Sequence, residues 1–174
     1  VRGKYYAMIA GTSDVVTVPS NWQTTVSKNL YDLRDKSLAK LEADQVQKVD
    51  IVSPTQEITL QRQGEDSWAI TKPMTARASE SDIRDLSNKI QNGKIHQFIE
   101  EKPDFPEIYG MDDPRLVLTF WQGDDPSANL SAQTIIVGST TTERGMPYAK
   151  HGGKDNIFTI EESVLETVPE SADA

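Results

Sequence analysis

The sequence predicts an α+β fold in which antiparallel β-sheets carry two or three packed helices. Short segments with alternating apolar and polar residues are separated by turns rich in Gly, Pro and Asp, which is typical of antiparallel strands. One segment, residues 79–92, instead places its apolar residues at helical spacing. The strands follow one another in runs rather than alternating with helices, which favours α+β over a parallel α/β sheet. The 174 residues include three Trp and four Phe, enough for one folded core.

The first predicted elements form a hairpin followed by a helix. Residues 5–10 and 15–18 are apolar strand segments on either side of a Gly-Thr-Ser-Asp turn. Pro19, Ser20 and Asn21 are helix-start signals. The helix that we expect after them has Trp22, Val26, Leu30 and Leu33 on one face. The remaining strands are expected at residues 46–52, 57–61, 67–71, 95–99, 115–121, 134–137, 147–150 and 156–160.

The clearest predicted helix begins at Ser79 and ends before Gly93. Ser79 and Asp82 have the spacing of a helix N-cap, and Gly is a frequent helix terminator. Another helix is expected over 161–168, and residues 100–114 are expected to form an ordered loop. Phe105, Ile108, Tyr109 and Met111 are the expected anchors of that loop. The predicted common core consists of Trp68, Ile83, Leu86, Ile90, Leu118, Phe120 and Phe158.

Charge and composition argue against several classes of function. Lys and Arg number 18 against 27 Asp and Glu, which gives a net charge of −9. A nucleic-acid binder normally carries a basic face, so binding to nucleic acid or to an anionic membrane surface is disfavoured. The absence of Cys excludes disulfides, thiolate catalysis and iron–sulfur clusters. The longest apolar run, residues 5–10, is far shorter than the roughly 20 residues of a membrane-spanning helix.

The residues that could carry chemistry do not form a recognised motif. The only histidines, His96 and His151, are far apart in the sequence and have no other ligand type at helical spacing. The acid pairs 100–101, 112–113 and 161–162 lie in exposed-looking turns, and residues 123–126 lack the ligand pattern of a calcium loop. Gly-x-Ser-x-Gly, Walker and Gly-x-Gly-x-x-Gly strings are absent. We therefore predict no catalytic, cofactor-binding or metal site and a protein that is not an enzyme.

The two ends of the sequence resemble each other when one is shifted by 142 positions. The shift aligns two segments, residues 6–26 and 148–168, without a gap, and each reads as strand, Gly turn, strand and helix. Identical residues coincide at Tyr6 and Tyr148, Ala7 and Ala149, Gly11 and Gly153, Thr17 and Thr159, Thr25 and Thr167, and Val26 and Val168. We therefore expect a partial internal duplication. Residues 1–26 would be the tail of a preceding repeat unit, 27–168 one complete unit and 169–174 a frayed tail, so the chain would be a piece of a longer protein.

Several strings in the predicted complete unit resemble the bacterial domain-of-unknown-function family 4340. The strings are Leu33-Arg34-Asp35-Lys36 with Leu38, then Trp68 and Pro73, then Tyr109-Gly110-Met111-Asp112-Asp113-Pro114, then Gly138 and Tyr148-Ala149. Met111 replaces the Leu that this family usually has. The resemblance covers roughly residues 30–168 and implies tandem units behind a membrane anchor. Some members resemble accessory subunits of gliding-motility-type ABC transporters.

The family has no established catalytic residues, and we interpret the motif residues as structural. In the 109–114 string, Gly110 would take a positive φ, an Asp would cap a turn and Pro114 would start a strand. A ligand loop is the alternative interpretation.

The functional hypothesis is a non-catalytic, extracytoplasmic module of a membrane-anchored bacterial protein. It would act as a spacer or scaffold or bind a protein partner, either a separate protein or adjacent repeat units, and the parent protein could be transporter-associated. The alternative is a domain that binds an envelope ligand, a glycan or a peptide, and a hydrolase is a third hypothesis.

Overall fold

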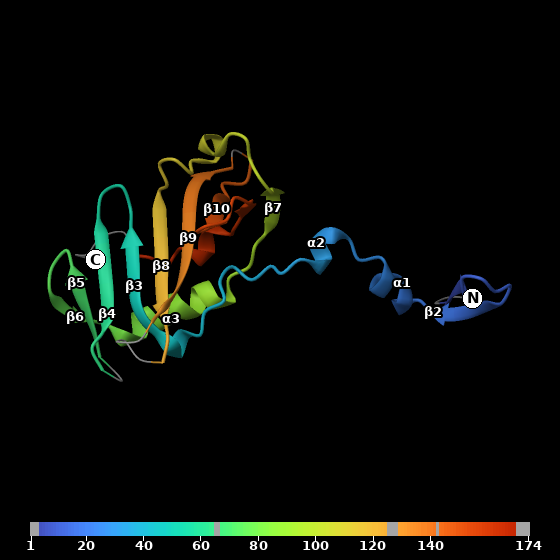
Figure 1. The fold of residues 1–174 in the computed structure, drawn as a ribbon, viewed down its shortest axis with the longest axis horizontal. Helices are drawn as coiled ribbons and strands as arrows, with labels where there is room; N and C mark the ends of the chain where they lie inside the picture. The colour runs from blue at the N-terminus through green and yellow to red at the C-terminus, as the bar shows by residue number, and fades with distance from the viewer. Residues whose placement is uncertain (1–3, 65–66, 125–128, 142, 170–174) are drawn as a thin grey trace. The chain divides into compact units, whose positions relative to one another are not determined.

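The chain folds as two compact units, Val1–Asp35 and Lys36–Ala174. The computed structural model describes residues 4–64, 67–124, 129–141 and 143–169 (Figure 1). The predicted frayed tail, 169–174, lies outside the described residues except for Pro169.

The first unit is a β-hairpin followed by two short helices. Strands β1 (Lys4–Met8) and β2 (Val15–Pro19) pair antiparallel, as the alternating pattern predicts. The single helix expected after them is wrong, because α1 (Asn21–Val26) ends before a second helix, α2 (Leu30–Leu33), begins. Asn29 causes the restart: its side chain accepts a hydrogen bond from the Asp32 backbone N–H at 2.9 Å, and the Asp32 carboxylate accepts one from the Asn29 N–H at 3.0 Å. This reciprocal capping box starts a new helix where the apolar spacing alone suggests a continuous one.

The second unit is built on one nine-stranded sheet in which every pair of neighbours is antiparallel (Figure 1). Its strands are β3 (Val46–Val52), β4 (Glu57–Arg62), β5 (Trp68–Lys72), β6 (Ala76–Ala78), β7 (Gln97–Glu100), β8 (Leu116–Gln122), β9 (Ser131–Thr140), β10 (Pro147–His151) and β11 (Ile157–Thr159). The order across the sheet is β6-β5-β4-β3-β8-β9-β10-β11-β7. The hairpin β10–β11 therefore lies inside the sheet, between β9 and β7.

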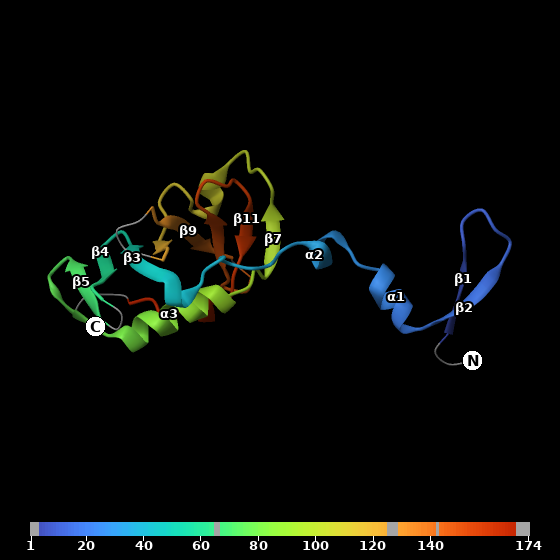
Figure 2. The ribbon, with the colours of Figure 1, turned by 60° about the horizontal axis from the view of Figure 1, so that its bottom comes forward.

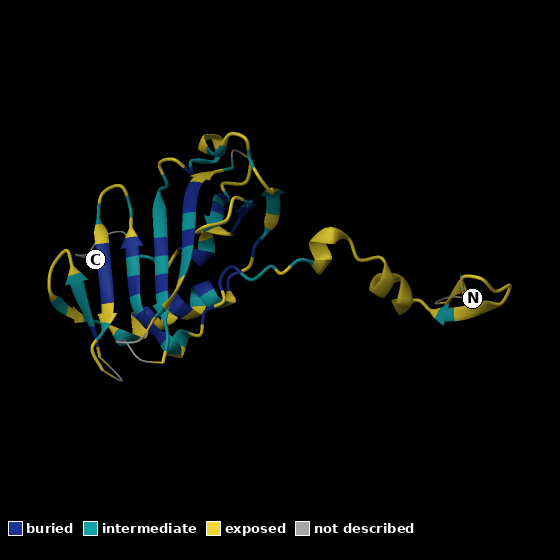
Figure 3. Ribbon diagram, viewed as in Figure 1, coloured by how far each residue is buried: buried dark blue, intermediate teal, exposed yellow. Residues whose placement is uncertain are grey.

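One face of this sheet is covered by α3 (Glu80–Asn92), which runs beneath the strands in Figure 2. Ser79 caps the helix by accepting a hydrogen bond from the Asp82 N–H, and Gly93 ends it, as predicted. Ile83, Leu86 and Ile90 of α3 belong to one buried cluster with side chains from the sheet. The seven residues predicted to share a core all belong to that cluster, which confirms the prediction. Figure 3 shows the resulting alternation of buried and more exposed positions along the strands.

The fold is richer in β-structure than the sequence suggests. Of the three α-helices in the described part of the chain, α3 packs on the nine-stranded sheet, whereas α1 and α2 belong to the first unit and have no buried residues. The helix expected over 161–168 is instead a 3-10 helix, η3 (Glu162–Val164), followed by turns. The short strand β6 was not predicted, because its Ala-Arg-Ala sequence has little β-propensity. It forms by pairing with β5.

The loop over residues 101–115 contains another 3-10 helix, η2 (Pro106–Tyr109). Met111 is 8% exposed and anchors the loop as expected. Phe105 and Ile108 do not, because they are 63% and 65% exposed. Apolar character alone therefore overestimates the number of anchors in this loop.

Candidate functional site

Four of the motif residues, from three separate parts of the sequence, meet where η2 crosses β9. Tyr109 and Tyr148 form an edge-to-face ring pair with centroids 4.9 Å apart. The Tyr109 hydroxyl donates a hydrogen bond of 2.8 Å to Glu100 Oε2, and this bond is the main reason that the pKa of Tyr109 is raised. Gly110 follows directly with φ +72°, as predicted for this position.

Gly110 and Gly138 allow the backbone of η2 to lie directly on β9. A Cβ atom on Gly138 would lie 2.0 Å from the Tyr109 carbonyl oxygen, and one on Gly110 would lie 2.6 Å from the Ser139 nitrogen. Side chains do not fit at such separations, so both glycines have a packing role. This contact supports the structural interpretation of the Tyr109-Gly110 string.

The other motif residues lie away from this contact. Trp68 is 4% exposed in the core, with the Arg62 guanidinium 5.3 Å from its ring centroid. Pro73 follows β5 after a cis peptide bond, and Asp112 and Pro114 lie in the segment between η2 and β8. The motif pair Arg34 and Asp35 follows α2 at the end of the first unit.

A charged network that the sequence does not indicate surrounds Asp50, on the sheet face opposite α3. Asp50 accepts hydrogen bonds from Thr59 Oγ1 at 2.9 Å and from Trp121 Nε1 at 2.8 Å, and Lys48 Nζ lies 2.8 Å from its Oδ2. Burial alone would raise the pKa of this carboxyl, but the contacts with Lys48, Trp121 and Thr59 outweigh that effect and lower it. Lys48 also lies 5.4 Å from the Trp121 ring centroid. The three partners come from β3, β4 and β8, so only strand register brings them together.

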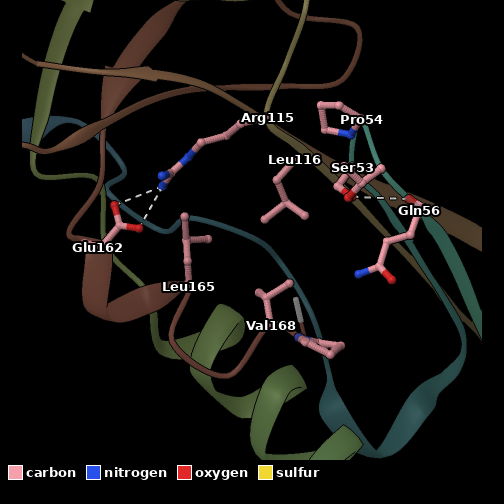
Figure 4. A pocket seen from close by; sticks show the side chains of 10 residues that line it. Ser53, Pro54, Gln56, Arg115, Leu116, Glu162, Leu165 and Val168 are labelled. Atoms are coloured by element: carbon pink, nitrogen blue, oxygen red, sulfur yellow. Dashed lines mark hydrogen bonds and ion pairs between the residues drawn. The ribbon is translucent and has the colours of Figure 1, made fainter. Parts of the chain in front are cut away.

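A groove of about 410 Å³ lies between the β3–β4 turn and the segment that follows β11. Figure 4 shows aliphatic side chains of Leu116, Leu165 and Val168 between Pro54 on one side and a charged pair on the other. In that pair, Arg115 Nη2 is 2.9 Å from each carboxylate oxygen of Glu162. Both partners are more than one-third exposed, so the pair contributes little to stability. The lining of the groove is thus partly aliphatic and partly charged.

A second hollow, of about 380 Å³, lies at the β7 edge of the sheet. Its lining includes Tyr148 and Thr159, which are cross-strand partners in β10 and β11, and Gln97 and Ile99 of β7. The β9–β10 loop contributes further polar and apolar side chains. The other residues of the lining are His96, Thr141, Glu143, Arg144 and Met146. Sequence reasoning missed this hollow, because its residues come from four separate segments.

The described residues contain no group of three or more His, Asp or Glu side chains placed to hold a metal ion. His151 ends β10, where its Nε2 lies 2.8 Å from the Leu38 carbonyl oxygen. Within the same described part of the chain, no helix has the length and apolar character needed to cross a membrane.

The hairpins of the two units have the same register at the shift of 142 positions. Tyr6 pairs with Thr17 as Tyr148 pairs with Thr159, and Ala7 pairs with Val16 as Ala149 pairs with Phe158. The hairpin part of the predicted likeness between residues 6–26 and 148–168 is therefore confirmed.

The turns of the two hairpins also correspond. Gly11 and Gly153 have φ of +84° and +73°. The Thr12 N–H donates to the Ile9 carbonyl at 3.0 Å, as the Lys154 N–H donates to the His151 carbonyl at 3.2 Å. The segments after the hairpins differ, because 21–26 is an α-helix whereas 162–164 is a 3-10 helix.

The hairpins differ in their surroundings. Ala149 and Phe158 are 0% exposed within the nine-stranded sheet, and so is Ile160, which follows β11. The counterparts of Phe158 and Tyr148, Val16 and Tyr6, are 44% and 79% exposed. The first hairpin thus has the internal geometry of a sheet hairpin and pairs with no other strand of the described chain.

Comparison with known proteins agrees with this repetition. No curated protein and no solved structure gives a significant match. One family profile matches twice, over residues 1–105 and 68–174, which is consistent with a tandem arrangement. The chain therefore belongs to the family described as Domain of unknown function (DUF4340).

Proposed function

We propose that this chain is a non-catalytic part of a tandem array that acts as a spacer or scaffold and presents surfaces to protein partners. The observation that carries the proposal is the shared register of hairpins β1–β2 and β10–β11 in two different surroundings. A hairpin that exposes its apolar side chains is at best marginally stable in water. Its stability has to come from a neighbouring sheet.

The place of β10–β11 supports an assignment of that sheet. In the second unit, β10 pairs with β9 and β11 pairs with β7, so the hairpin has a neighbour on both sides. Those positions are occupied by the unit's own hairpin. The hairpin β1–β2 would therefore complete the sheet of another copy of the same fold, with β1 beside a β9-like strand and β2 beside a β7-like strand.

This proposal keeps the repeat boundaries predicted from the sequence. Residues 1–26 would end one unit, 27–168 would form the next, and the segment with α2 would connect them. An array of such units would hold binding surfaces at a fixed spacing. Together with the family resemblance, this supports an extracytoplasmic role in a membrane-anchored, transporter-associated parent protein.

Hydrogen exchange read by mass spectrometry tests the array. In this chain, the β1–β2 amides should exchange within seconds, whereas those of β10–β11 should be protected by the sheet. In a longer version of the parent protein with one more unit before Val1, the β1–β2 amides should become protected. Fast exchange in both proteins would show that the hairpin has no sheet partner and would contradict the array.

Ligand binding is a second candidate function, favoured by the hollow at the β7 edge. Its volume of about 380 Å³ lies in the range of small-ligand sites, which is roughly 300–1,000 Å³. We propose a peptide or a glycan of the cell envelope as the class of ligand.

A further inference from the structure

We propose that the hollow at the β7 edge binds a small peptide-derived zwitterion, of amino-acid or dipeptide size, with free amino and carboxylate ends. This inference deepens the ligand-binding candidate and is independent of the array. It rests on two features of the lining side chains: their charges, and the polar groups among them that make no hydrogen bond with a described residue.

Two opposite charges line the hollow without forming an ion pair within the described part of the chain. Arg144 presents a guanidinium, and Glu143 presents a carboxylate. Both residues are exposed and belong to the β9–β10 loop. A guanidinium matches a carboxylate in geometry and charge, and a carboxylate binds an ammonium group. Together they would fit a ligand with one charge of each sign.

The strands supply neutral polar groups between these charges. The Tyr148 hydroxyl and the Gln97 side-chain amide make no hydrogen bond with any described residue, and both line the hollow. Both groups can donate to or accept from a peptide bond or a terminus. Ile99 and Met146 complete the lining with apolar contact area for an aliphatic side chain.

Thr159 adds an independent observation. It is 2% exposed, and its Oγ1 is buried without a hydrogen-bond partner among the described residues. A buried hydroxyl without a hydrogen-bond partner destabilises a folded protein, and such local losses of stability are concentrated at functional sites.

The Tyr–Thr pair also recurs at Tyr6 and Thr17 with the same register. Packing in the core explains why Ala is found at position 149 as at position 7, because Ala149 is fully buried. The side chains of Tyr148 and Thr159 lie on the face opposite Ala149 and Phe158, where Tyr148 contacts the Tyr109 ring and Thr159 Oγ1 has no hydrogen-bond partner among the described residues. A binding role on that face accounts for the recurrence of both.

Isothermal titration calorimetry with the dipeptide Ala-Val tests the proposal on the full chain. Its N-acetyl form and its C-terminal amide form each remove one charge, and each should bind at least about tenfold more weakly, the equivalent of 1.4 kcal/mol. The variant Arg144→Gln should abolish the difference between the free and amidated dipeptides. Glu143→Gln should abolish the difference between the free and acetylated dipeptides. The control Arg77→Gln, on β6 at the other end of the sheet, should leave all three affinities unchanged.

Thr159→Val gives a second readout that a purely structural role would not produce. The variant should raise the urea midpoint of the free protein, because it removes the unpartnered hydroxyl, and should weaken dipeptide binding. If dipeptide at concentrations up to about 10 mM gives no saturable binding, the dissociation constant is weaker than the millimolar range, and the proposal is overturned. Equal effects of Arg144→Gln on all three probes would also overturn it. Neither outcome would alter hydrogen exchange in β1–β2, so failure here is distinguishable from failure of the array.

Discussion

At some positions in this chain, close backbone contacts determine which residue type fits. Composition does not show those contacts. Gly110 combines a left-handed backbone with contact to Ser139, whereas Gly145 has φ +64° and open space around its would-be Cβ. The sequence predicts the positive φ of Gly110 from its place in a turn string. It does not predict that Gly138, more than twenty residues later, lies against the same backbone, because that contact depends on where η2 crosses β9.

The glycine contact gives the first prediction. Gly110→Ala should lower the free energy of unfolding by about 2 kcal/mol or more, because it adds a backbone clash to the cost of a left-handed alanine. Gly145→Ala is the matched control and should lose only the conformational part, about 1–2 kcal/mol. Urea unfolding followed by tryptophan fluorescence measures both. Equal losses would show that the η2–β9 contact can relax at no cost.

Asp50 gives a prediction for pH dependence. Its pKa is lowered in the folded protein, so the stability that its contacts contribute is present above its ordinary value of 3.8 and is lost as the pH falls through the folded value. The difference in unfolding free energy between the wild type and Asp50→Asn should therefore shrink as the pH is lowered below about 4. Urea titrations at a series of pH values measure this difference. A difference that stays constant down to the acid limit would contradict the role of the charged form.

At the level of elements, periodicity predicts the strands and α3 well and the helical segment 21–33 poorly. The apolar spacing from Trp22 to Leu33 fits one helix, but the side chain of Asn29 offers the backbone a new start. No described residue of this segment is buried. Local capping, and not apolar spacing, therefore determines where the helices begin and end. Packing against a core, which stabilises α3, does not counteract the break.

The break leads to a prediction for Asn29→Ala. Removing the cap should cost α2 about 1 kcal/mol, enough to unfold a helix of four residues. Cα chemical shifts of residues 30–33 should move toward random-coil values, while the urea midpoint of the second unit stays unchanged. Ser27→Ala, before the cap, is the control and should preserve the shifts of α2. Helical shifts that persist in Asn29→Ala would show that something other than the capping box holds α2.

At the scale of the whole molecule, the sequence predicts the antiparallel sheet, its core and the repetition of the hairpin. The candidate hollow could not be predicted in this way. It depends on β7 pairing with β11 and on the β9–β10 loop lying nearby, and both follow from a strand order that skips between distant segments. Alternating patterns identify the face that a residue occupies, but they do not identify its neighbour across the sheet.

The difference in burial between the two units predicts which unit contributes most of the stability of the chain. Trp68 is 4% exposed in the core of the second unit, whereas Trp22 is 53% exposed in the first. Trp68→Ala should lower the free energy of unfolding by about 3–5 kcal/mol. Trp22→Ala should change it by less than about 0.5 kcal/mol, as an exposed substitution does. Urea titrations of the two variants measure these values, and a similar loss for both would contradict the division of stability between the units.

The same pair of substitutions connects stability to the proposed array. The shift of 142 positions places Trp22 on Val164, which is 7% exposed in the core of the second unit. In a parent protein with a further unit before Val1, Trp22 should be buried as Val164 is. There, Trp22→Ala should cost about as much as Trp68→Ala does here, roughly 3–5 kcal/mol. If Trp22→Ala is silent in the longer protein as well, the hairpin and its helix dock on no neighbouring sheet, and the spacing function built on that docking has no physical basis.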